Sequence, residues 1–273
     1  MPDASQTGVG RIGLGKIGVG DLMSRIGPRD PPLDRDRLRN SLDAGLAEMD
    51  PGIGDALDAS ARERLIAYLE LLARWNRAYN LTAVRDPMQM VPRHLLDSLV
   101  VLPWILHGPV LDAGTGAGLP GLPLAIARPG LAFTLLDSNG KKTRFVRQAL
   151  LELRVDNAEV VQSRLQTYRP QRKFATIVAR AVASLAELRD TCAHLAAHDA
   201  RLLALKGRLP EQEIADLVSR SAPLEAATPG APADAVATAA GLTASIGVHS
   251  LKVPLLAAER NLIVIPFHAS AHG

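Results

Sequence analysis

Residues 110–121 read VLDAGTGAGLPG, a short apolar run that ends in a turn with four glycines. Three of them, Gly114, Gly116 and Gly118, leave the backbone free for a tight turn and let a ligand approach without a β-carbon in the way. In a parallel sheet, a strand that ends in such a turn places the ligand at the carboxyl edge of the sheet. The stretch therefore predicts a strand, a turn and a helix, with a small-molecule site at the turn.

Downstream of the turn, short apolar runs alternate with helical patterns. We expect strands over residues 110–113, 133–137, 159–162, 174–179, 201–206, about 245–253 and 261–267, and helices over 120–127, 141–153, 184–197 and about 210–220. Alternating strands and helices imply parallel strands joined by right-handed crossovers. Because no helix separates the last two strands, the last strand should be antiparallel. The pattern predicts an α/β fold with a seven-stranded, mostly parallel sheet, which is typical of Rossmann-like class I methyltransferases.

Helical patterns precede the sheet between residues 34 and 98. Over residues 60–79, apolar side chains recur at spacings of three and four, as on one face of a helix. Ser60 and Glu63 stand in capping-box register, which predicts the start of that helix. Asp86, followed by a proline, has the cap position of a further helix.

The chain is expected to have three parts. Residues 1–33, rich in Gly, Pro, Asp and Arg, predict a flexible tail, and residues 34–98 a helical segment. The α/β domain should extend over residues 99–269. Within it, residues 221–244 are dominated by Ala, Pro, Gly and Thr, which indicates a low-complexity surface loop.

Composition excludes several classes of protein. The 273 residues are 47% hydrophobic, so a wholly disordered chain is excluded, and a net charge of +3 is only mildly basic. With one cysteine, Cys192, the chain has no internal disulfide and no multi-thiolate zinc site. The most apolar run, residues 99–106, is far shorter than the roughly 20 residues of a membrane span. We expect a cytoplasmic monomer without a membrane span or a bound metal.

Two acidic residues flank the glycine turn and bear on the choice of cofactor. Asp137 closes the second expected strand, where a carboxylate can accept hydrogen bonds from both ribose hydroxyls of a nucleoside. Gly116, Gly118 and Gly121 also spell GxGxxG, so a nicotinamide or flavin dinucleotide is one alternative. Asp112, directly before the turn, favours S-adenosylmethionine (SAM), because a carboxylate there would hold the cationic methionine end but repel a pyrophosphate.

Seven stretches together resemble the RsmG family, also called GidB, of bacterial small-subunit ribosomal RNA methyltransferases. They are RWNRAYNLTAVRDP (74–87), RHLLDS (93–98), DAGTGAGLPG (112–121), FTLLDSNGKKTRFVR (133–147), QSRLQ (162–166), ARAVAS (179–184) and LALKG (203–207). The resemblance covers about residues 60–267. It implies a SAM-dependent enzyme that methylates N7 of the guanine at position 527 of 16S rRNA, acting on the rRNA or the small ribosomal subunit.

The resemblance also implies further residues that contact SAM, in addition to Asp112, Gly116 and Asp137. They are Gly114 and Leu119 in the turn, Leu165 and Gln166 after the third strand, and Arg180 after the fourth. Gln166 departs from the family, whose members usually carry Glu there. The amide keeps donor and acceptor capacity but loses the charge.

No catalytic side chain is expected. Guanine N7 carries a lone pair and no hydrogen, so methyl transfer needs alignment of nucleophile, methyl and leaving sulfur rather than a general base. Cys192 lies in an expected helix, and we interpret it as a small core residue rather than a nucleophile. His194 and His198 are four residues apart but lack a third metal ligand.

Basic residues cluster between Lys141 and Lys173, with nine Lys or Arg against three acidic residues. This excess predicts contacts with RNA phosphates. The residues expected to contact RNA are Lys141, Lys142, Arg144, Arg93, His94 and Lys206. Two other functions stay open at this point: an NAD(P)-dependent oxidoreductase, and a ribosome-assembly factor that binds RNA without catalysis.

Overall fold

The computed structural model describes residues 33–180, 183–221 and 246–267, which belong to one compact unit. The expected tail and the expected low-complexity loop therefore lie almost wholly outside the described residues. The proposed boundary between a helical segment and the α/β domain stays a prediction.

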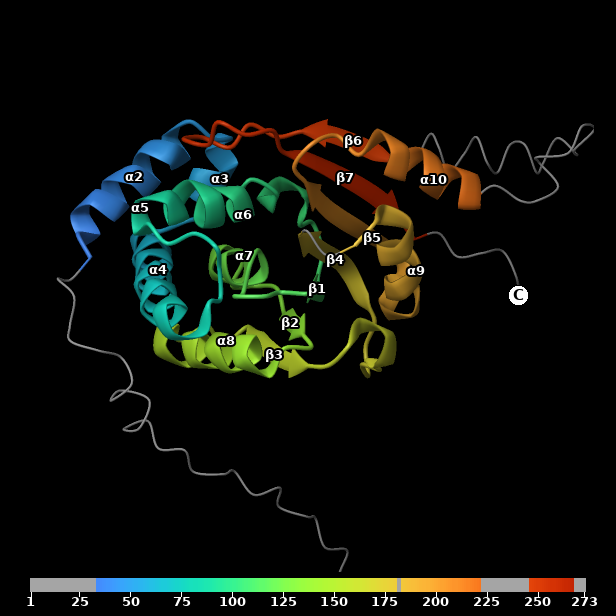
Figure 1. Cartoon of the computed structure of the whole chain (residues 1–273), viewed down its shortest axis with the longest axis horizontal. Coiled ribbons are helices and arrows are strands. Elements are labelled where there is room, and N and C mark those ends of the chain that lie inside the picture. The colour runs from blue at the N-terminus through green and yellow to red at the C-terminus, as the bar shows by residue number, and fades with distance from the viewer. Residues whose placement is uncertain (1–32, 181–182, 222–245, 268–273) are drawn as a thin grey trace, which may run out of the picture. The chain divides into compact units, whose positions relative to one another are not determined.

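The centre of this unit is a seven-stranded sheet (Figure 1). Its strands are β1 (Val110–Ala113), β2 (Phe133–Asp137), β3 (Ala158–Gln162), β4 (Phe174–Arg180), β5 (Ala196–Lys206), β6 (Gly247–Ser250) and β7 (Asn261–Pro266), in the order β3-β2-β1-β4-β5-β7-β6. The first five strands are parallel, and β7 runs antiparallel to both β5 and β6. The fold expected from the sequence is confirmed.

Helices cover both faces of the sheet. The helices that follow the strands are α7 (Gly121–Ala127), α8 (Gly140–Leu153), α9 (Leu185–Cys192) and α10 (Glu211–Ser221). On one face, α7 and α8 pack against β2 and β3, and on the other, α9 packs against β5 and α10. Because β1 is buried on both faces, its side chains alternate between two apolar layers: Leu111 and Ala113 join the core under α9.

The boundary between α9 and β5 differs from the expectation. Ser184 caps α9 as the sequence predicts, accepting from the Glu187 N–H, but the helix ends at Cys192 rather than at residue 197. A 3-10 turn, η4 (Ala193–Leu195), follows, and β5 begins at Ala196, five residues before its expected start. His198 and Asp199 are exposed and polar, and they interrupt the apolar run, so the sequence pattern does not indicate a strand over residues 196–200.

The N-terminal helices pack on the α7 and α8 side. They are α2 (Arg35–Ala47), α3 (Pro51–Asp55), α4 (Ala59–Tyr79), α5 (Pro87–Met90), the π-helical turn η1 (Val91–Leu96) and α6 (Asp97–Leu99), followed by the 3-10 turn η2 (Leu102–Trp104). Helix α4 lies against both α7 and α8 (Figure 1). This packing places the loop after α4 above the carboxyl edge of the sheet, where β1 ends.

The capping box expected at Ser60 is wrong. Helix α4 starts one residue earlier, and the Asp58 carboxylate caps it by accepting from the Ala61 N–H at 2.6 Å. Glu63 instead pairs with Arg35 and Arg39 of α2. A carboxylate at the cap position also complements the positive end of the helix dipole, and the two guanidiniums attract Glu63 away from the backbone.

Candidate active site

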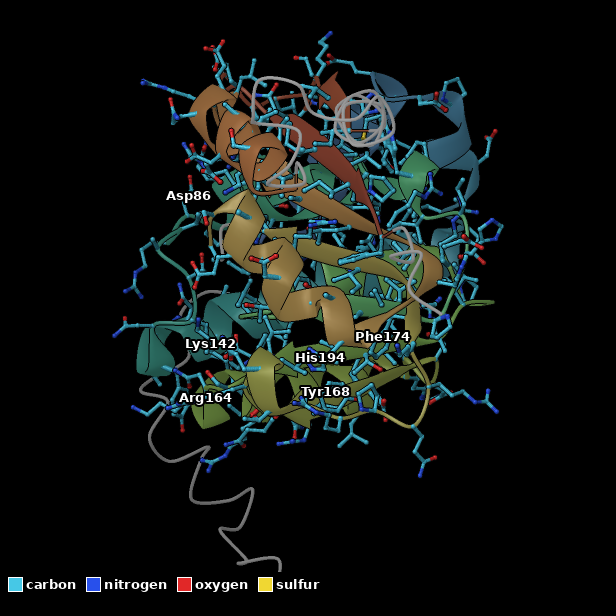
Figure 2. All side chains as sticks on the ribbon, turned by 90° about the vertical axis from the view of Figure 1, so that its right-hand side faces the viewer. Asp86, Lys142, Arg164, Tyr168, Phe174 and His194 are labelled. Atoms are coloured by element: carbon cyan, nitrogen blue, oxygen red, sulfur yellow. The ribbon has the colours of Figure 1, made fainter. Side chains whose placement is uncertain are left out.

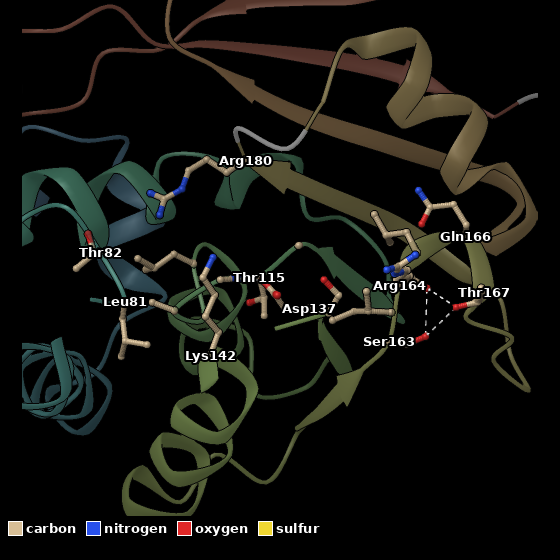
Figure 3. A pocket seen from close by; sticks show the side chains of 17 residues that line it. Leu81, Thr82, Thr115, Asp137, Lys142, Ser163, Arg164, Gln166, Thr167 and Arg180 are labelled. Atoms are coloured by element: carbon tan, nitrogen blue, oxygen red, sulfur yellow. Dashed lines mark hydrogen bonds between the residues drawn. The ribbon is translucent and has the colours of Figure 1, made fainter. Parts of the chain in front are cut away.

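A cavity of about 820 Å³ opens at the carboxyl ends of β1, β2 and β4 (Figure 3). It is lined by the glycine turn after β1, by Asp137 and Lys142 after β2, by the 3-10 turn η3 (Leu165–Thr167) after β3, and by Arg180 at the end of β4. All of the expected cofactor residues except Asp112 line it: Gly114, Gly116, Leu119, Asp137, Leu165, Gln166 and Arg180.

The turn adopts backbone conformations that favour glycine. Gly114, Gly116 and Gly118 have φ angles of 78°, 60° and 94°, in the left-handed region that other residues rarely adopt. At Gly121 the reason for glycine is space, because a β-carbon there would lie 2.5 Å from the Asp112 Oδ2 atom. The turn is therefore specified by its sequence at these positions.

The Asp137 carboxylate ties the turn to the end of β2. Its Oδ2 atom accepts from the Gly116 N–H at 2.9 Å, and its Oδ1 atom from the Asn139 N–H at 2.8 Å. Each oxygen has a second lone pair. Since the side chain also lines the cavity, those lone pairs are available to a ligand.

Asp112 lies beneath the turn rather than in the cavity. It is fully buried, and its Oδ2 atom accepts from the Thr115 hydroxyl at 2.6 Å and from the Gly121 N–H at 2.7 Å. Burial raises the pKa of this carboxyl to about 6. Asp112 thus braces both ends of the turn, and the contact with a cofactor expected from the sequence stays a prediction.

The residues expected to contact RNA fall into three groups. Lys142 lines the cavity itself, on the same side of the molecule as Arg164 (Figure 2), and no partner is found for its ammonium group among the described residues. Lys141 and Arg144 line a neighbouring groove of about 650 Å³ along α8, which also contains Arg147. Arg93, His94 and Lys206 line a smaller chamber on the other side of Arg180.

Several cavity residues were not expected from the sequence. Leu81 and Thr82, from the loop after α4, and Arg164, before η3, all line the cavity. Leu81 and Thr82 lie within the stretch 74–87 that carries the resemblance, so the sequence could have indicated that this loop belongs to the site. Asp97 of the smaller chamber lies within the stretch 93–98 that also carries the resemblance, whereas Arg260 lies outside every such stretch and is brought to Asp97 by the fold.

Neither Cys192 nor the histidine pair forms a reactive site. Cys192 lies in the apolar core, and burial raises the pKa of its thiol to about 12. His194 Nε2 lies 3.0 Å from the Tyr168 carbonyl oxygen, and the two residues are neighbours in Figure 2. Within residues 33–180, 183–221 and 246–267, no three His, Cys, Asp or Glu side chains gather as metal ligands. None of the helices described there is long and apolar enough to cross a membrane.

The chain is similar to several known proteins. A protein named ribosomal RNA small subunit methyltransferase G from Alkalilimnicola ehrlichii is 55% identical over 60% of this chain and 75% of its own length. The protein of that name from Erwinia tasmaniensis is 44% identical over 79% of this chain and 94% of its own length. Among solved structures, magnesium protoporphyrin IX methyltransferase from Synechocystis PCC 6803 aligns with a TM-score of 0.47 and 17% identity, covering 77% of this chain and 98% of that one.

A family model also matches most of the part of the chain that builds the cavity. The model, described as GidB, rRNA small subunit methyltransferase G, matches residues 61–227. That range contains all but the first two residues of α4, together with the glycine turn, Asp137, η3 and Arg180. The chain belongs to the rRNA small subunit methyltransferase G family.

Proposed function

We propose that this chain transfers the methyl group of SAM to N7 of a guanine in 16S rRNA of the small ribosomal subunit. The family resemblance implies the guanine at position 527. The observation that carries the proposal is the cavity at the carboxyl edge of the sheet, where the glycine turn and the Asp137 carboxylate meet in a member of a methyltransferase family. Bound SAM would supply an electrophilic methyl group on a sulfonium.

The residues that line the cavity fit SAM. The free lone pairs of Asp137 can accept from the two ribose hydroxyls, and the positive-φ glycines let the nucleoside lie close to the backbone. Gln166 lies on the side of Asp137 away from Lys142 (Figure 3), where it can bond the adenine edge. Leu81, Leu119 and Leu165 add apolar surface to the lining of the cavity.

The chain needs to align the two reactants but not to move a proton. The N7 lone pair of guanine is free at neutral pH, so a general base has no step to perform. His94, which bonds the cavity residue Thr82, agrees with this, because burial lowers its pKa to about 4 and leaves its ring neutral. We infer that the catalytic contribution of the chain is to hold SAM and the guanine in line.

The geometry of the turn favours SAM over a dinucleotide. A pyrophosphate is bound by free backbone N–H groups of such a turn. Here the Gly116 N–H is bonded to Asp137 and the Gly121 N–H to Asp112, while the Gly118 and Leu119 N–H groups are bonded to the Thr115 carbonyl. Because these N–H groups are already bonded, they cannot donate to a pyrophosphate. The carboxylates of Asp112 and Asp137 would also repel its negative charge.

The charges around the cavity support an RNA substrate. Lys141, Arg144 and Arg147 line the groove along α8, and no carboxylate lines it among the described residues. Together with Lys142 and Arg164, which line the cavity, these side chains can contact an RNA backbone. We also propose that the enzyme is cytoplasmic and acts as a monomer and without a metal.

Methyl transfer to ribosomal RNA tests the proposal directly. Small subunits from cells lacking this gene are incubated with the full chain and tritiated SAM, and the methylated base is mapped by mass spectrometry. Label at N7 of one guanine of 16S rRNA is the expected result. RNA binding without transfer would instead identify an assembly factor, and tighter calorimetric binding of NADH than of S-adenosylhomocysteine (SAH) would identify an oxidoreductase.

A further inference from the structure

A second chamber, of about 320 Å³, adjoins the cofactor cavity. Its charged and polar lining consists of Arg93, His94, Asp97, Arg180, Lys206 and Arg260, which we call the arginine chamber. Arg180 lines both this chamber and the cofactor cavity, so one side chain separates the two spaces. A group bound in the chamber would therefore lie next to the methyl donor.

A single buried carboxylate organises the chamber. Asp97 is 3% exposed at its side chain and forms ion pairs with Arg180, at 2.9 Å, and with Arg260. Arg180 comes from the end of β4, and Arg260 directly precedes β7. Because Asp97 holds both guanidiniums, their remaining N–H groups keep fixed directions.

Cations exceed anions in the chamber. Lys206 pairs with Glu213 at 2.8 Å, so its charge is balanced. The single negative charge of Asp97 balances one of the two positive charges of Arg180 and Arg260. The Arg93 backbone carbonyl accepts from Arg180 at 3.3 Å, but its guanidinium makes one long contact, 3.5 Å to the Gln89 side chain, and the residue is exposed. His94 adds no charge, because its ring is neutral and its Nε2 atom is engaged with the Thr82 hydroxyl at 3.0 Å. The chamber thus offers unpaired positive charge next to the cavity.

The balance of donors and acceptors selects the ligand. SAM carries a sulfonium and an ammonium against one carboxylate, so its net positive charge is repelled by the chamber. The Watson–Crick edge of guanine presents two N–H donor groups and a single acceptor, O6, whereas the chamber offers mainly donors. A phosphate group has acceptors only and matches guanidinium N–H groups in bidentate geometry.

We propose that the arginine chamber binds a backbone phosphate of the RNA beside the target guanosine. The proposal rests on the proposed function and deepens it: the phosphate would fix the nucleotide while its base enters the cofactor cavity past Arg180. Arg93 and Arg260 contact the phosphate, and Asp97 acts through them as a positioning residue.

Arg93→Ala tests the proposal with the least disturbance, because Arg93 is exposed and outside the Asp97 pairs. Loss of a charge-assisted bond should raise the KM for small subunits about tenfold at unchanged kcat and unchanged SAH affinity. The logarithm of the association constant for deproteinised 16S rRNA decreases with the logarithm of the salt concentration, and the magnitude of this slope should be smaller by about 0.7 to 0.9 in Arg93→Ala. Arg93→Lys should restore part of the affinity.

The matched control is Arg37→Ala, an exposed arginine on α2 outside the chamber, which should leave both KM and the salt slope at wild-type values. A wild-type KM and slope for Arg93→Ala would overturn the phosphate site while the methylation result still stands. Absence of any methyl transfer by the wild-type chain would overturn the proposed function and the phosphate site together. Equal losses for Arg93→Ala and Arg37→Ala would show a diffuse charge effect and also overturn the site.

Discussion

The hydroxyl of Tyr68, in the middle of α4, donates a hydrogen bond of 2.8 Å to the carbonyl oxygen of Ala117, in the glycine turn. Tyr68 is fully buried, and burial raises the pKa of its phenol well above the usual value, so the hydroxyl stays a donor. The N-terminal helices therefore hold the cofactor turn from above, while Asp112 braces it from below. The turn is held from both sides by bonds that come from different parts of the chain.

Tyr68→Phe should loosen the turn without emptying the core. The ring still fills its place against Phe145, but the Ala117 carbonyl loses its partner. We expect a loss of about 1 to 3 kcal/mol in the free energy of unfolding and a several-fold weaker affinity for SAH. Denaturant unfolding and calorimetry measure the two effects. Tyr79→Phe is the control, since no partner for that hydroxyl is found among the described residues, and an equal effect there would contradict the role of Tyr68.

Asp137→Ala should weaken SAM binding at least about tenfold, because it removes acceptors for both ribose hydroxyls. The same change also frees the Gly116 and Asn139 N–H groups. Asp137→Asn separates the two effects, since an amide keeps one acceptor for the turn but loses the charge. Calorimetry with SAM should rank the chains as wild type, then Asn, then Ala. Unchanged affinity in Asp137→Ala would place the cofactor elsewhere.

The sheet could be predicted from the sequence because its central strands are buried on both faces. Such strands are rich in contiguous apolar residues, as in residues 177–179 of β4, and their ends can be located to within a residue. The first half of β5 could not be found, because the exposed residues His198 and Asp199 break the run. The sequence pattern misplaces the start of α4, because Asp58 and Ser60 both have side chains that can cap a helix. The packing against α2, where Glu63 pairs with Arg39, decides between them.

The cofactor cavity was predicted better than its surroundings. Residues at strand ends, such as Gly116 and Asp137, meet at one edge of a parallel sheet by topology, so their neighbourhood follows from the fold. The pairing of Asp97 with Arg260 joins residues 163 positions apart and depends on the antiparallel return of β7. No periodicity or motif in the sequence indicates it. The structure gives Asp112 a bracing role that its spacing did not indicate, and its expected contact with the cofactor stays a prediction.

The raised pKa of Asp112 makes stability depend on pH. Between about pH 4 and pH 6 the native carboxyl keeps its proton while the unfolded one has lost it, so the native state is destabilised relative to the unfolded state as pH rises. Over this window, each pH unit of increase should lower the unfolding free energy of the wild type, relative to that of Asp112→Asn, by up to about 1.4 kcal/mol. Above about pH 7 the difference should be constant. Urea unfolding at several pH values measures it, and a difference that does not vary from pH 4 to pH 7 would contradict the raised pKa.

Asp97→Ala should destabilise the chain strongly. Without that carboxylate, Arg180 and Arg260 face each other with no balancing charge in a largely buried place. Breaking a buried pair on one side costs about 3 to 5 kcal/mol, which denaturant unfolding would detect. As a control, Asp199→Ala removes a carboxylate that is 92% exposed, and little change is expected. A loss below about 1 kcal/mol for Asp97→Ala would mean that solvent screens both guanidiniums.

Gln166→Glu should tighten SAM binding. Gln166 lies at the cavity beside Leu165, where it can accept from the adenine amino group, and a carboxylate is the stronger acceptor because the bond becomes charge-assisted. We expect a gain in affinity of about threefold to tenfold, seen with both SAM and SAH by calorimetry, since both carry the same adenine. As a control, Gln171→Glu adds the same charge in a groove at the opposite edge of the sheet, where the strands begin, and it should leave the affinity unchanged. Equal or weaker binding by Gln166→Glu would show that the amide donates to the ligand instead, because a carboxylate cannot replace a donor.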